Sequence, residues 1–333
     1  MRIVRCDKNP IVTPGLFAWR KATVFNPAAI VHEGKFYLFE RAAGSLRPWL
    51  CHIGLLASDD GVRFSHVVDK PVFTPEMMGW PQGSVQDPRV VKLDDTFYMV
   101  YAVRPYAIHV GQRPGFDIKE YYPELKDGTV SNRTRSAIAV SKDLVHWEHL
   151  DFCTPEAVDD RDVILFPEKI GGRYALLRRP QGGVYTGKPP SIYISYSTDL
   201  KDWSEPELLA APKFKWEGAK IGGSTPPIRT ESGWLFLYHG VDKDVVYRVG
   251  AMLLDPDDPR KVLARTRIAI MEPTDDYERV GSPYIGNVVF PCGAVVNDGI
   301  LHIYYGCCDY TIGLATVPVV ELVEFLLMGG NEE

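Results

Sequence analysis

Five charged residues each end or interrupt an apolar, strand-like run of the sequence. They are Arg41, Asp87, Arg179, His239 and Asp309. A single residue of this kind is usually a solvated surface group, but five of them in five separate segments indicate a shared site. Two carboxylates in one site suggest cleavage of a glycosidic bond, because inverting glycoside hydrolases place an acid and a base about 6.5–9.5 Å apart.

Basic residues change this interpretation. Up to five cations would surround the same pocket of an acidic protein: Arg41, Arg47, Arg161, Arg179 and Lys220. Arginine binds phosphate oxygens in bidentate geometry and lysine adds a compact charge, so this set suits a bound oxyanion better than a neutral sugar and water. If phosphate is the nucleophile, one carboxylic acid is enough, because the phosphate dianion attacks without losing a proton.

The strands that would position these residues recur along the chain. A turn followed by an apolar, aromatic-rich strand appears five times, with Phe36, Phe97, Tyr174, Trp234 and Leu301 in equivalent positions, 61, 77, 60 and 67 residues apart. Units of this length with about four strands each are typical of a β-propeller. The sequence therefore predicts an all-β fold, a single five-bladed β-propeller over residues 1–333. We expect the recurring strands to be innermost, so that the charged residues face the mouth of the central channel.

Two arginines belong to the third repeat. Arg161 lies between Asp160 and Asp162, before the first strand of that repeat, and Arg179 ends the strand. We therefore expect both to reach one oxyanion from different directions. The alternative for Arg161 is a surface ion pair with Asp160 or Asp162.

Other patterns are interpreted as structural. A turn of the form Ser-x-Asp-x-x-x-aromatic occurs three times, and its Ser and Asp side chains can bond the backbone of the turn. Its members are Ser58, Asp60 and Phe64; Ser141, Asp143 and Trp147; Ser197, Asp199 and Trp203. The apolar segment 317–328 predicts a closing strand or a short helix.

Composition excludes several classes of function. Of 333 residues, 45% are hydrophobic and 24% are charged, and 37 Lys and Arg against 43 Asp and Glu give a net charge of −6. No basic run stands out, so we expect no nucleic-acid partner. No apolar stretch reaches the ~18 residues of a membrane helix, which predicts a soluble, cytoplasmic protein without a membrane partner. The six cysteines show no Cys-x-x-Cys spacing, which predicts free thiols and no metal site.

Several motifs, in their order along the chain, resemble those of glycoside hydrolase family 130, the mannoside phosphorylases and their hydrolytic relatives. They are Phe25-Asn26-Pro27-Ala28, Gln86-Asp87-Pro88-Arg89-Val90, Leu165-Phe166-Pro167-Glu168-Lys169, Lys220-Ile221-Gly222-Gly223, Tyr238-His239-Gly240-Val241, Gly250-Ala251-Met252-Leu253-Leu254-Asp255 and Asn287-Val288-Val289-Phe290-Pro291-Cys292. The resemblance covers nearly the whole chain and implies a five-bladed propeller. Pro27 departs from the pattern, because some relatives offer a small polar residue to the sugar there.

The resemblance also implies a role for each candidate residue. Asp87, in the Asp-Pro-Arg motif, matches the general acid, whose proton reaches the glycosidic oxygen through the mannose 3-hydroxyl while phosphate attacks the anomeric carbon from the opposite face. The product is α-mannose 1-phosphate. The phosphate-binding positions are matched by Arg47, Arg161, Arg179, Lys220, His239 and Tyr247. The positions that hold the mannosyl residue are matched by Asn26, Arg41 and Asp309.

The resulting hypothesis is an inverting β-mannoside phosphorylase acting on a β-mannosyl disaccharide or short oligosaccharide. It uses inorganic phosphate as cosubstrate and neither a metal nor an organic cofactor. A β-1,4 linkage is the first expectation and β-1,2 the second, and the acceptor sugar is left open. The alternatives are a β-mannosidase of the same family, in which glutamates activate water, and a sugar-binding propeller without turnover.

One connection is longer than a link between blade strands needs to be. Residues 104–133 are predicted to form a lid over the acceptor sugar, a contact in a homo-oligomer, or an exposed loop. Within this segment, Tyr106, Tyr121 and Tyr122 are candidates to stack on a sugar face.

Overall fold

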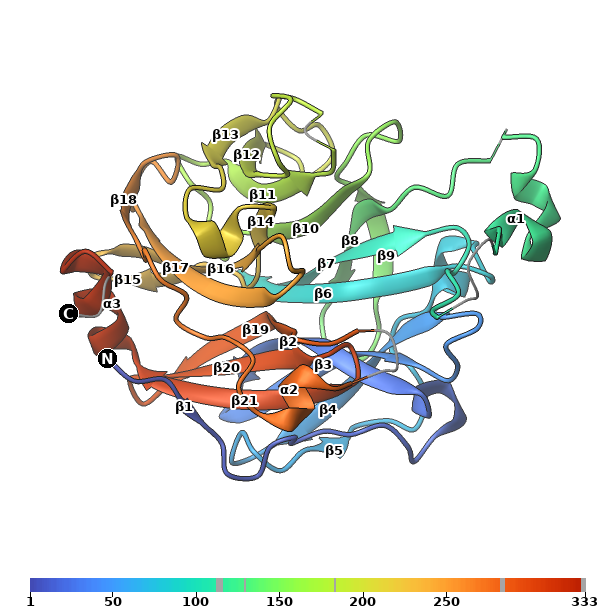
Figure 1. The fold of residues 1–333 in the computed structure, drawn as a ribbon, viewed down its shortest axis with the longest axis horizontal. Helices are drawn as coiled ribbons and strands as arrows, with labels where there is room; N and C mark the ends of the chain where they lie inside the picture. The colour runs from blue at the N-terminus through green and yellow to red at the C-terminus, as the bar shows by residue number, and fades with distance from the viewer. Residues whose placement is uncertain (112–115, 129, 183, 282–284, 331–333) are drawn as a thin grey trace.

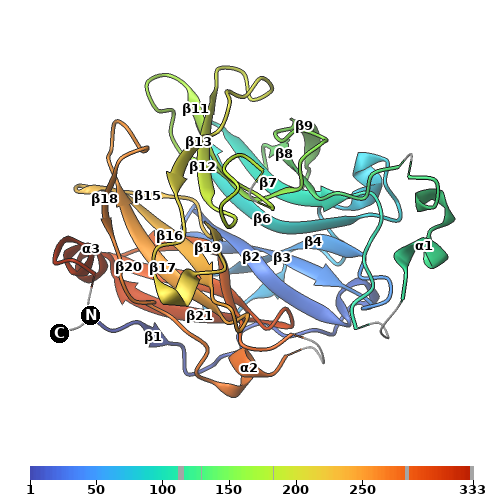
Figure 2. The same ribbon diagram turned by 45° about the horizontal axis from the view of Figure 1, so that its top comes forward.

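The computed structural model shows five antiparallel β-sheets that follow one another along the chain and form a ring (Figure 1). It describes residues 1–111, 116–128, 130–182, 184–281 and 285–330. Each sheet is one blade, and in Figure 2 the last blade lies beside the first. The prediction of an all-β, five-bladed propeller is therefore confirmed.

The first three blades are each continuous in sequence. Blade 1 contains β2 (Thr23–His32), β3 (Lys35–Ala43), β4 (Cys51–Ser58) and β5 (Ser65–His66). Blade 2 contains β6 (Ser84–Leu93), β7 (Thr96–Arg104), β8 (Arg135–Ser141) and β9 (Glu148–Phe152). Blade 3 contains β10 (Asp160–Leu165), β11 (Tyr174–Pro180), β12 (Ile192–Ser197) and β13 (Glu207–Ala210).

The last two blades depart from this simple order. Blade 4 contains β14 (Lys220–Gly223), β16 (Gly233–Val241), β17 (Tyr247–Leu254) and β18 (Val262–Arg265), and β15 (Ile228–Thr230) pairs with β16. Blade 5 contains β19 (Val289–Asn297), β20 (Ile300–Cys307), β21 (Thr311–Pro318) and the N-terminal β1 (Val4–Arg5). Because β1 pairs with β21, the two ends of the chain close the ring together.

Helices are short and lie outside the sheets. They are α1 (Ile118–Tyr121), α2 (Asp276–Arg279) and α3 (Val319–Leu327), with the 3₁₀ turns η1 (Ala18–Arg20), η2 (Pro75–Met78), η3 (Pro123–Leu125) and η4 (Lys215–Glu217). Of the two expectations for segment 317–328, the helix is observed as α3, while β1 supplies the closing strand. None of the helices in the described ranges has the length and apolar character needed to cross a bilayer.

The strands nearest the axis are not the recurring aromatic-rich ones. The first strand of each sheet, namely β2, β6, β10, β14 or β19, lies innermost, and the recurring strands β3, β7, β11, β16 and β20 are second in their sheets. The expectation that the recurring strands are innermost was therefore wrong, and the limited space near the axis explains why. A Cβ atom at Gly293 of β19 would collide with Ala28 and Ala29 of β2, so small residues are needed where the blades converge. The bulky apolar run therefore falls on the next strand outward.

The three Ser-x-Asp turns have the predicted structural role. In the first turn, the Ser58 hydroxyl accepts hydrogen bonds from the backbone N–H groups of Asp60 and Gly61, at 3.2 and 2.9 Å. The Asp60 carboxylate in turn accepts from the N–H groups of Val62 and Arg63. The turns at Asp143 and Asp199 repeat this arrangement. These residues hold hairpins together and lie outside the pocket described below.

The cysteines are free thiols, as predicted. Five of the six are buried, and Cys6 is half-buried. Burial raises the pKa of the thiols of Cys153, Cys292 and Cys307, so these side chains are unreactive packing groups. The described residues also contain no group of three or more His, Cys, Asp or Glu side chains placed to hold a metal ion.

Candidate active site

A pocket of about 570 Å³ lies where the innermost strands begin, and all five blades contribute to it. Nine of the ten predicted site residues line this pocket: Asn26, Arg41, Asp87, Arg161, Arg179, Lys220, His239, Tyr247 and Asp309. Residues up to 283 positions apart in the sequence therefore meet in one cavity, as the propeller hypothesis required. Arg47 is not among the residues that line it.

Three acidic or amide side chains reach the pocket from bulges in innermost strands. Asn26, Asp87 and Asp162 have φ angles of 45°, 48° and 51°, and the strand pairing shifts at each of these positions. A bulge bends the strand and re-aims a side chain, and Asn and Asp tolerate positive φ better than most residues. The bulges thus turn these side chains toward the mouth of the channel.

Asp87 is held by two donors at one of its oxygens. Its Oδ1 accepts hydrogen bonds from Asn26 Nδ2 at 2.8 Å and from Arg41 Nη1 at 3.0 Å. The Arg41 guanidinium is itself packed against the rings of Phe25 and Trp49, 4.4 and 4.7 Å from their centroids. Within the described residues Oδ2 accepts no hydrogen bond, so this oxygen is left to exchange a proton with a substrate.

A second carboxylate, Asp309, lies near Asp87 in the pocket. Burial raises the pKa of Asp309 to about 6, and the Asp87 carboxylate adds to this effect while Arg41 and Lys220 oppose it. Asp309 follows β20 in a left-handed conformation with φ of 51°. It therefore changes charge in mildly acidic solution and can donate to, or accept from, a sugar hydroxyl.

The opposite side of the pocket is built around the buried Arg179–Asp162 ion pair. Arg179 Nε lies 2.5 Å from Asp162 Oδ2, and the two side chains are about 5% exposed. Burial alone would raise the pKa of the Asp162 carboxyl. The positive charges of Arg179 and Arg89 outweigh this effect and hold the pKa below its usual range. Arg179 Nη1 is buried but has no hydrogen-bond partner among the residues that the structure describes. A buried donor without an acceptor on a fixed arginine is suited to bind a ligand oxygen.

Blade 4 completes this side of the pocket. Lys220 Nζ donates a hydrogen bond to Tyr247 Oη at 2.7 Å. Burial and then repulsion by Arg179 lower the pKa of Lys220 to about 8, and burial raises the pKa of Tyr247 to about 12. Burial lowers the pKa of His239 to about 3, so its imidazole is neutral near pH 7 and contributes no charge to anion binding. Its Nδ1 is also buried, with no partner in the described ranges.

Arg161 differs from its predicted surroundings in two ways. It lies within the innermost strand β10, not before the first strand of the blade, and it is paired in register with Arg179 of β11. Its guanidinium donates two hydrogen bonds to Asp159, at 2.7 and 3.0 Å, rather than pairing with Asp160 or Asp162. Because the strand carries it to the pocket, Arg161 faces the site with 35% of its side chain exposed.

Arg47 is bound by the backbone of the long connection that follows β7. Its guanidinium donates hydrogen bonds to the backbone carbonyls of Val110, at 3.0 Å, and Gly111. These carbonyls belong to the long connection between β7 and β8, in which residues 112–115 and 129 lie outside the described residues. Arg47 therefore anchors this connection, and the structure does not bring it to the pocket.

The long connection 104–133 forms part of the pocket wall. Arg104 and Ile108 line the cavity, and the Ile108 carbonyl accepts a hydrogen bond from the Trp49 backbone at 2.7 Å. The tyrosines considered for sugar stacking, Tyr106, Tyr121 and Tyr122, pack against one another instead, with centroids 4.8–4.9 Å apart. None of these three lines the pocket.

Sequence reasoning missed several lining residues. They include Trp49, Gln86, Arg104, Ile108, Asp162 and Gln181. A signal for Asp162 was available, because it precedes the next hairpin turn by ten residues, much as Asn26 and Asp87 precede theirs by eight. No comparable pattern marks Arg104, because the irregular connection that follows it has no repeat equivalent.

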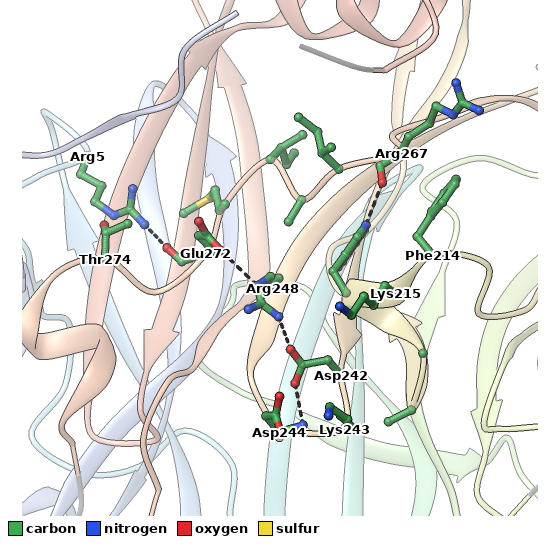
Figure 3. A pocket seen from close by; sticks show the side chains of 17 residues that line it. Arg5, Phe214, Lys215, Asp242, Lys243, Asp244, Arg248, Arg267, Glu272 and Thr274 are labelled. Atoms are coloured by element: carbon green, nitrogen blue, oxygen red, sulfur yellow. Dashed lines mark hydrogen bonds and ion pairs between the residues drawn. The ribbon is translucent and has the colours of Figure 1, made fainter. Parts of the chain in front are cut away.

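A second hollow of about 1110 Å³ adjoins the site on blade 4 (Figure 3). It shares Asp244 with the smaller pocket, but its walls are largely apolar. Its Arg248 is already paired with Asp242 and Glu272, at 2.6 and 3.1 Å. Its carboxylates Asp242 and Glu272 are thus already neutralised, and within the described residues none of its side chains has a buried polar atom without a partner. We therefore take the smaller pocket as the candidate active site.

Comparison with known proteins agrees with this geometry. Residues 11–327 match the profile of glycoside hydrolase family 130, described as β-1,4-mannooligosaccharide phosphorylase. A 1,2-β-oligomannan phosphorylase from Thermoanaerobacter sp. (strain X514) is 35% identical over 329 residues, which are 97% of this chain and 99% of that protein. A β-1,4-mannooligosaccharide phosphorylase from Ruminococcus albus is 32% identical over 342 residues, which are 97% of this chain and 90% of that protein.

A solved structure shows the same architecture. The β-1,2-mannobiose phosphorylase of Listeria innocua, in complex with β-1,2-mannobiose, superposes with a TM-score of 0.78 at 25% sequence identity. The match covers 98% of this chain and 100% of that one. The profile match over most of the sequence, together with the two relatives above, shows that the chain belongs to glycoside hydrolase family 130.

Proposed function

We propose that the protein is an inverting β-mannoside phosphorylase, which cleaves a terminal β-mannosyl residue with inorganic phosphate and releases α-mannose 1-phosphate. The observation that carries this proposal is the orphaned Arg179 Nη1, which lines the pocket together with two further cations, Arg161 and Lys220. A hydrolase needs a base to activate water, whereas this side of the pocket offers positive charge and unsatisfied donors. These groups suit a phosphate oxyanion.

In the proposed reaction, a phosphate oxygen forms a bond to the anomeric carbon of mannose while the bond from that carbon to the leaving oxygen breaks. The leaving oxygen takes the proton supplied by Asp87, whose Oδ2 is the available atom, either directly or through a sugar hydroxyl. Asn26 and Arg41 hold Oδ1 and fix the orientation of the carboxyl group. The cations bind phosphate on the other side of the pocket, so nucleophile and acid act on opposite faces of the sugar.

The residues of the pocket need no metal or organic cofactor for these steps, and phosphate is the cosubstrate. Positive charge from Arg179, Arg161 and Lys220 stabilises the incoming phosphate. Asp162 keeps Arg179 in one orientation, since their ion pair is buried and short. Arg179 can thus bind phosphate without the entropy cost of ordering a flexible side chain.

For the linkage, we propose β-1,2 before β-1,4, which reverses the order favoured from the sequence. The Thermoanaerobacter relative and the Listeria structure act on β-1,2-linked mannosides, according to their names, and the Ruminococcus relative on β-1,4-linked ones. All three are phosphorylases, so the linkage is the finer part of the proposal. Contacts on the acceptor side of the pocket determine which linkage is cleaved.

The deciding experiment incubates the purified protein with β-1,2-mannobiose and β-1,4-mannobiose, each with and without inorganic phosphate. Phosphorolysis predicts mannose 1-phosphate only where phosphate is present, with the β-1,2 substrate preferred. Free mannose formed equally well without phosphate would instead identify a β-mannosidase. Sugar binding without any product would identify a binding propeller. Preference for the β-1,4 substrate would overturn the linkage alone.

A further inference from the structure

Arg104 is a pocket residue with no part in the reaction described above. It is the last residue of β7, is paired in register with Ser84 of β6, and lines the same cavity as Asp87. Its guanidinium makes one hydrogen bond within the described residues, from Nη2 to Thr134 Oγ1 at 2.5 Å. Its Nε is buried and finds no partner in the part of the chain that the structure describes. Arg104 is thus a fixed cation with unused donors at the active site.

Charge around Arg104 is unbalanced. Burial lowers its pKa to about 10, and the neighbouring Arg161 and Arg41 add to this effect while Asp159 opposes it. Asp159, however, already accepts two hydrogen bonds from Arg161. In the described part of the chain, no carboxylate lies within ion-pair distance of Arg104. Arg104 is half-buried, and a partly desolvated cation without a carboxylate partner is stabilised when a ligand supplies oxygen acceptors.

Arg104 lies on the same blade as the proposed acid, and of the proposed phosphate-binding cations Arg161 of blade 3 is its neighbour. Lys220 and Tyr247 belong to blade 4, whereas Arg104 belongs to blade 2, which also carries Asp87. An inverting displacement places nucleophile and leaving group on opposite faces of the anomeric carbon. With phosphate beside blades 3 and 4, the leaving sugar lies toward blades 1 and 2, where Trp49 and Ile108 also line the pocket.

We propose that Arg104 binds hydroxyl oxygens of the leaving sugar and helps determine which acceptor the enzyme uses. This inference rests on the proposed phosphorolysis. Arginine presents several N–H donors in a rigid fork, and the bond to Thr134 restricts the directions in which the remaining donors point. Acceptors whose hydroxyl groups match those directions bind, and sugars that differ there bind less well.

The test compares Arg104→Met, Arg104→Lys and a control, Arg133→Met, which removes an exposed arginine from the same connection. In the synthetic direction, the KM for the acceptor is measured with mannose 1-phosphate as donor and a panel of sugars. In phosphorolysis, the KM for phosphate is measured. We expect Arg104→Met to raise the acceptor KM roughly tenfold to a hundredfold and to leave the phosphate KM near the parent value. Arg104→Lys, which keeps the charge but loses the fork, should change the ranking of acceptors.

Two results would overturn the role of Arg104. A phosphate KM that rises as much as the acceptor KM would assign Arg104 to the phosphate site, and an unchanged acceptor KM would leave it a structural role only. If Arg104→Met fails to fold, the same two constants are measured for Arg104→Lys. If the parent protein makes no mannose 1-phosphate, the proposed function fails separately. Calorimetric binding of mannose and β-1,2-mannobiose to the parent and Arg104→Met then still tests the contact, and equal affinities would refute it.

Discussion

Replacing Arg179 with methionine tests phosphate binding and the stability of the site in one variant. Methionine keeps much of the side-chain volume but removes the guanidinium, including the orphaned Nη1. A charged hydrogen bond contributes about 1.5–3 kcal/mol, which corresponds to a roughly 10- to 150-fold increase in the KM for phosphate. The fold should also lose stability, because the buried Asp162 carboxylate would lose its ion pair with Arg179, whose Nε lies 2.5 Å from Oδ2.

The structure allows an estimate of this second effect. After loss of Arg179, the Asp162 carboxylate faces Arg89 at 3.7 Å and His239, which is neutral near pH 7, at 3.4 Å. Removing one member of a buried ion pair typically costs about 3–5 kcal/mol, and Arg89 should keep the value near the lower end. The double variant Arg179→Met/Asp162→Asn removes the stranded charge, so it should recover most of the thermal stability.

The assay measures initial rates against phosphate concentration and thermal unfolding for the parent, the single variant and the double variant. Stability should recover in the double variant, whereas the KM for phosphate should stay high because the phosphate donor is still missing. A single variant with the parent's KM for phosphate would remove Arg179 from the phosphate site. Recovery of phosphate use together with stability would show that the single variant had merely distorted the pocket.

Three further predictions test other parts of the site. Asp87→Asn should lower kcat by about 10²–10⁴-fold while the KM for phosphate is retained, and an unchanged rate would exclude Asp87 as the acid. For phosphate, kcat/KM should fall as pH rises through about 8, because Lys220 loses its charge there, and Lys220→Arg should abolish that fall. Gly222→Ala should raise the KM for phosphate without removing a functional group, because the new Cβ atom would collide with Asp162. Gly218→Ala is the control and should leave this KM unchanged, because its Cβ atom would meet no atom closer than 3.5 Å.

The repeat made the architecture predictable from sequence. A turn and an aromatic-rich strand spaced five times along the chain identified the blades, and the charged residues beside these strands pointed to one shared cavity. Strand order within a blade was not predictable in the same way. The aromatic run of Trp234 to Tyr238 suggested an innermost strand, but close packing near the axis requires glycines such as Gly222 and Gly293 instead.

Residues supplied by irregular connections were the least predictable part of the site. Arg47 matched a phosphate-binding position by motif, yet carbonyls of the connection after β7 bind its guanidinium. Arg104 begins that same connection and reaches the pocket, although no sequence pattern marked it. The alternation of a strand predicts the direction of a side chain only within that strand. For a loop of this length, the sequence therefore does not predict which charged side chains face the pocket.

One local conformation, a bulge with positive φ, recurs at the proposed acid Asp87, at its hydrogen-bond donor Asn26 and at Asp162, which supports the proposed phosphate site. At Asn26, Asp87 and Asp162 the innermost strand adopts positive φ at nearly the same distance before its hairpin turn. Each bulge needs a residue that tolerates this backbone, and Asn and Asp are the polar residues that do so best. The backbone requirement and the chemical requirement therefore select the same residue types. A β-branched residue at any of these positions should destabilise the fold, because it does not tolerate the positive φ of the bulge. This loss of stability would come in addition to the loss of proton transfer or of the phosphate contact.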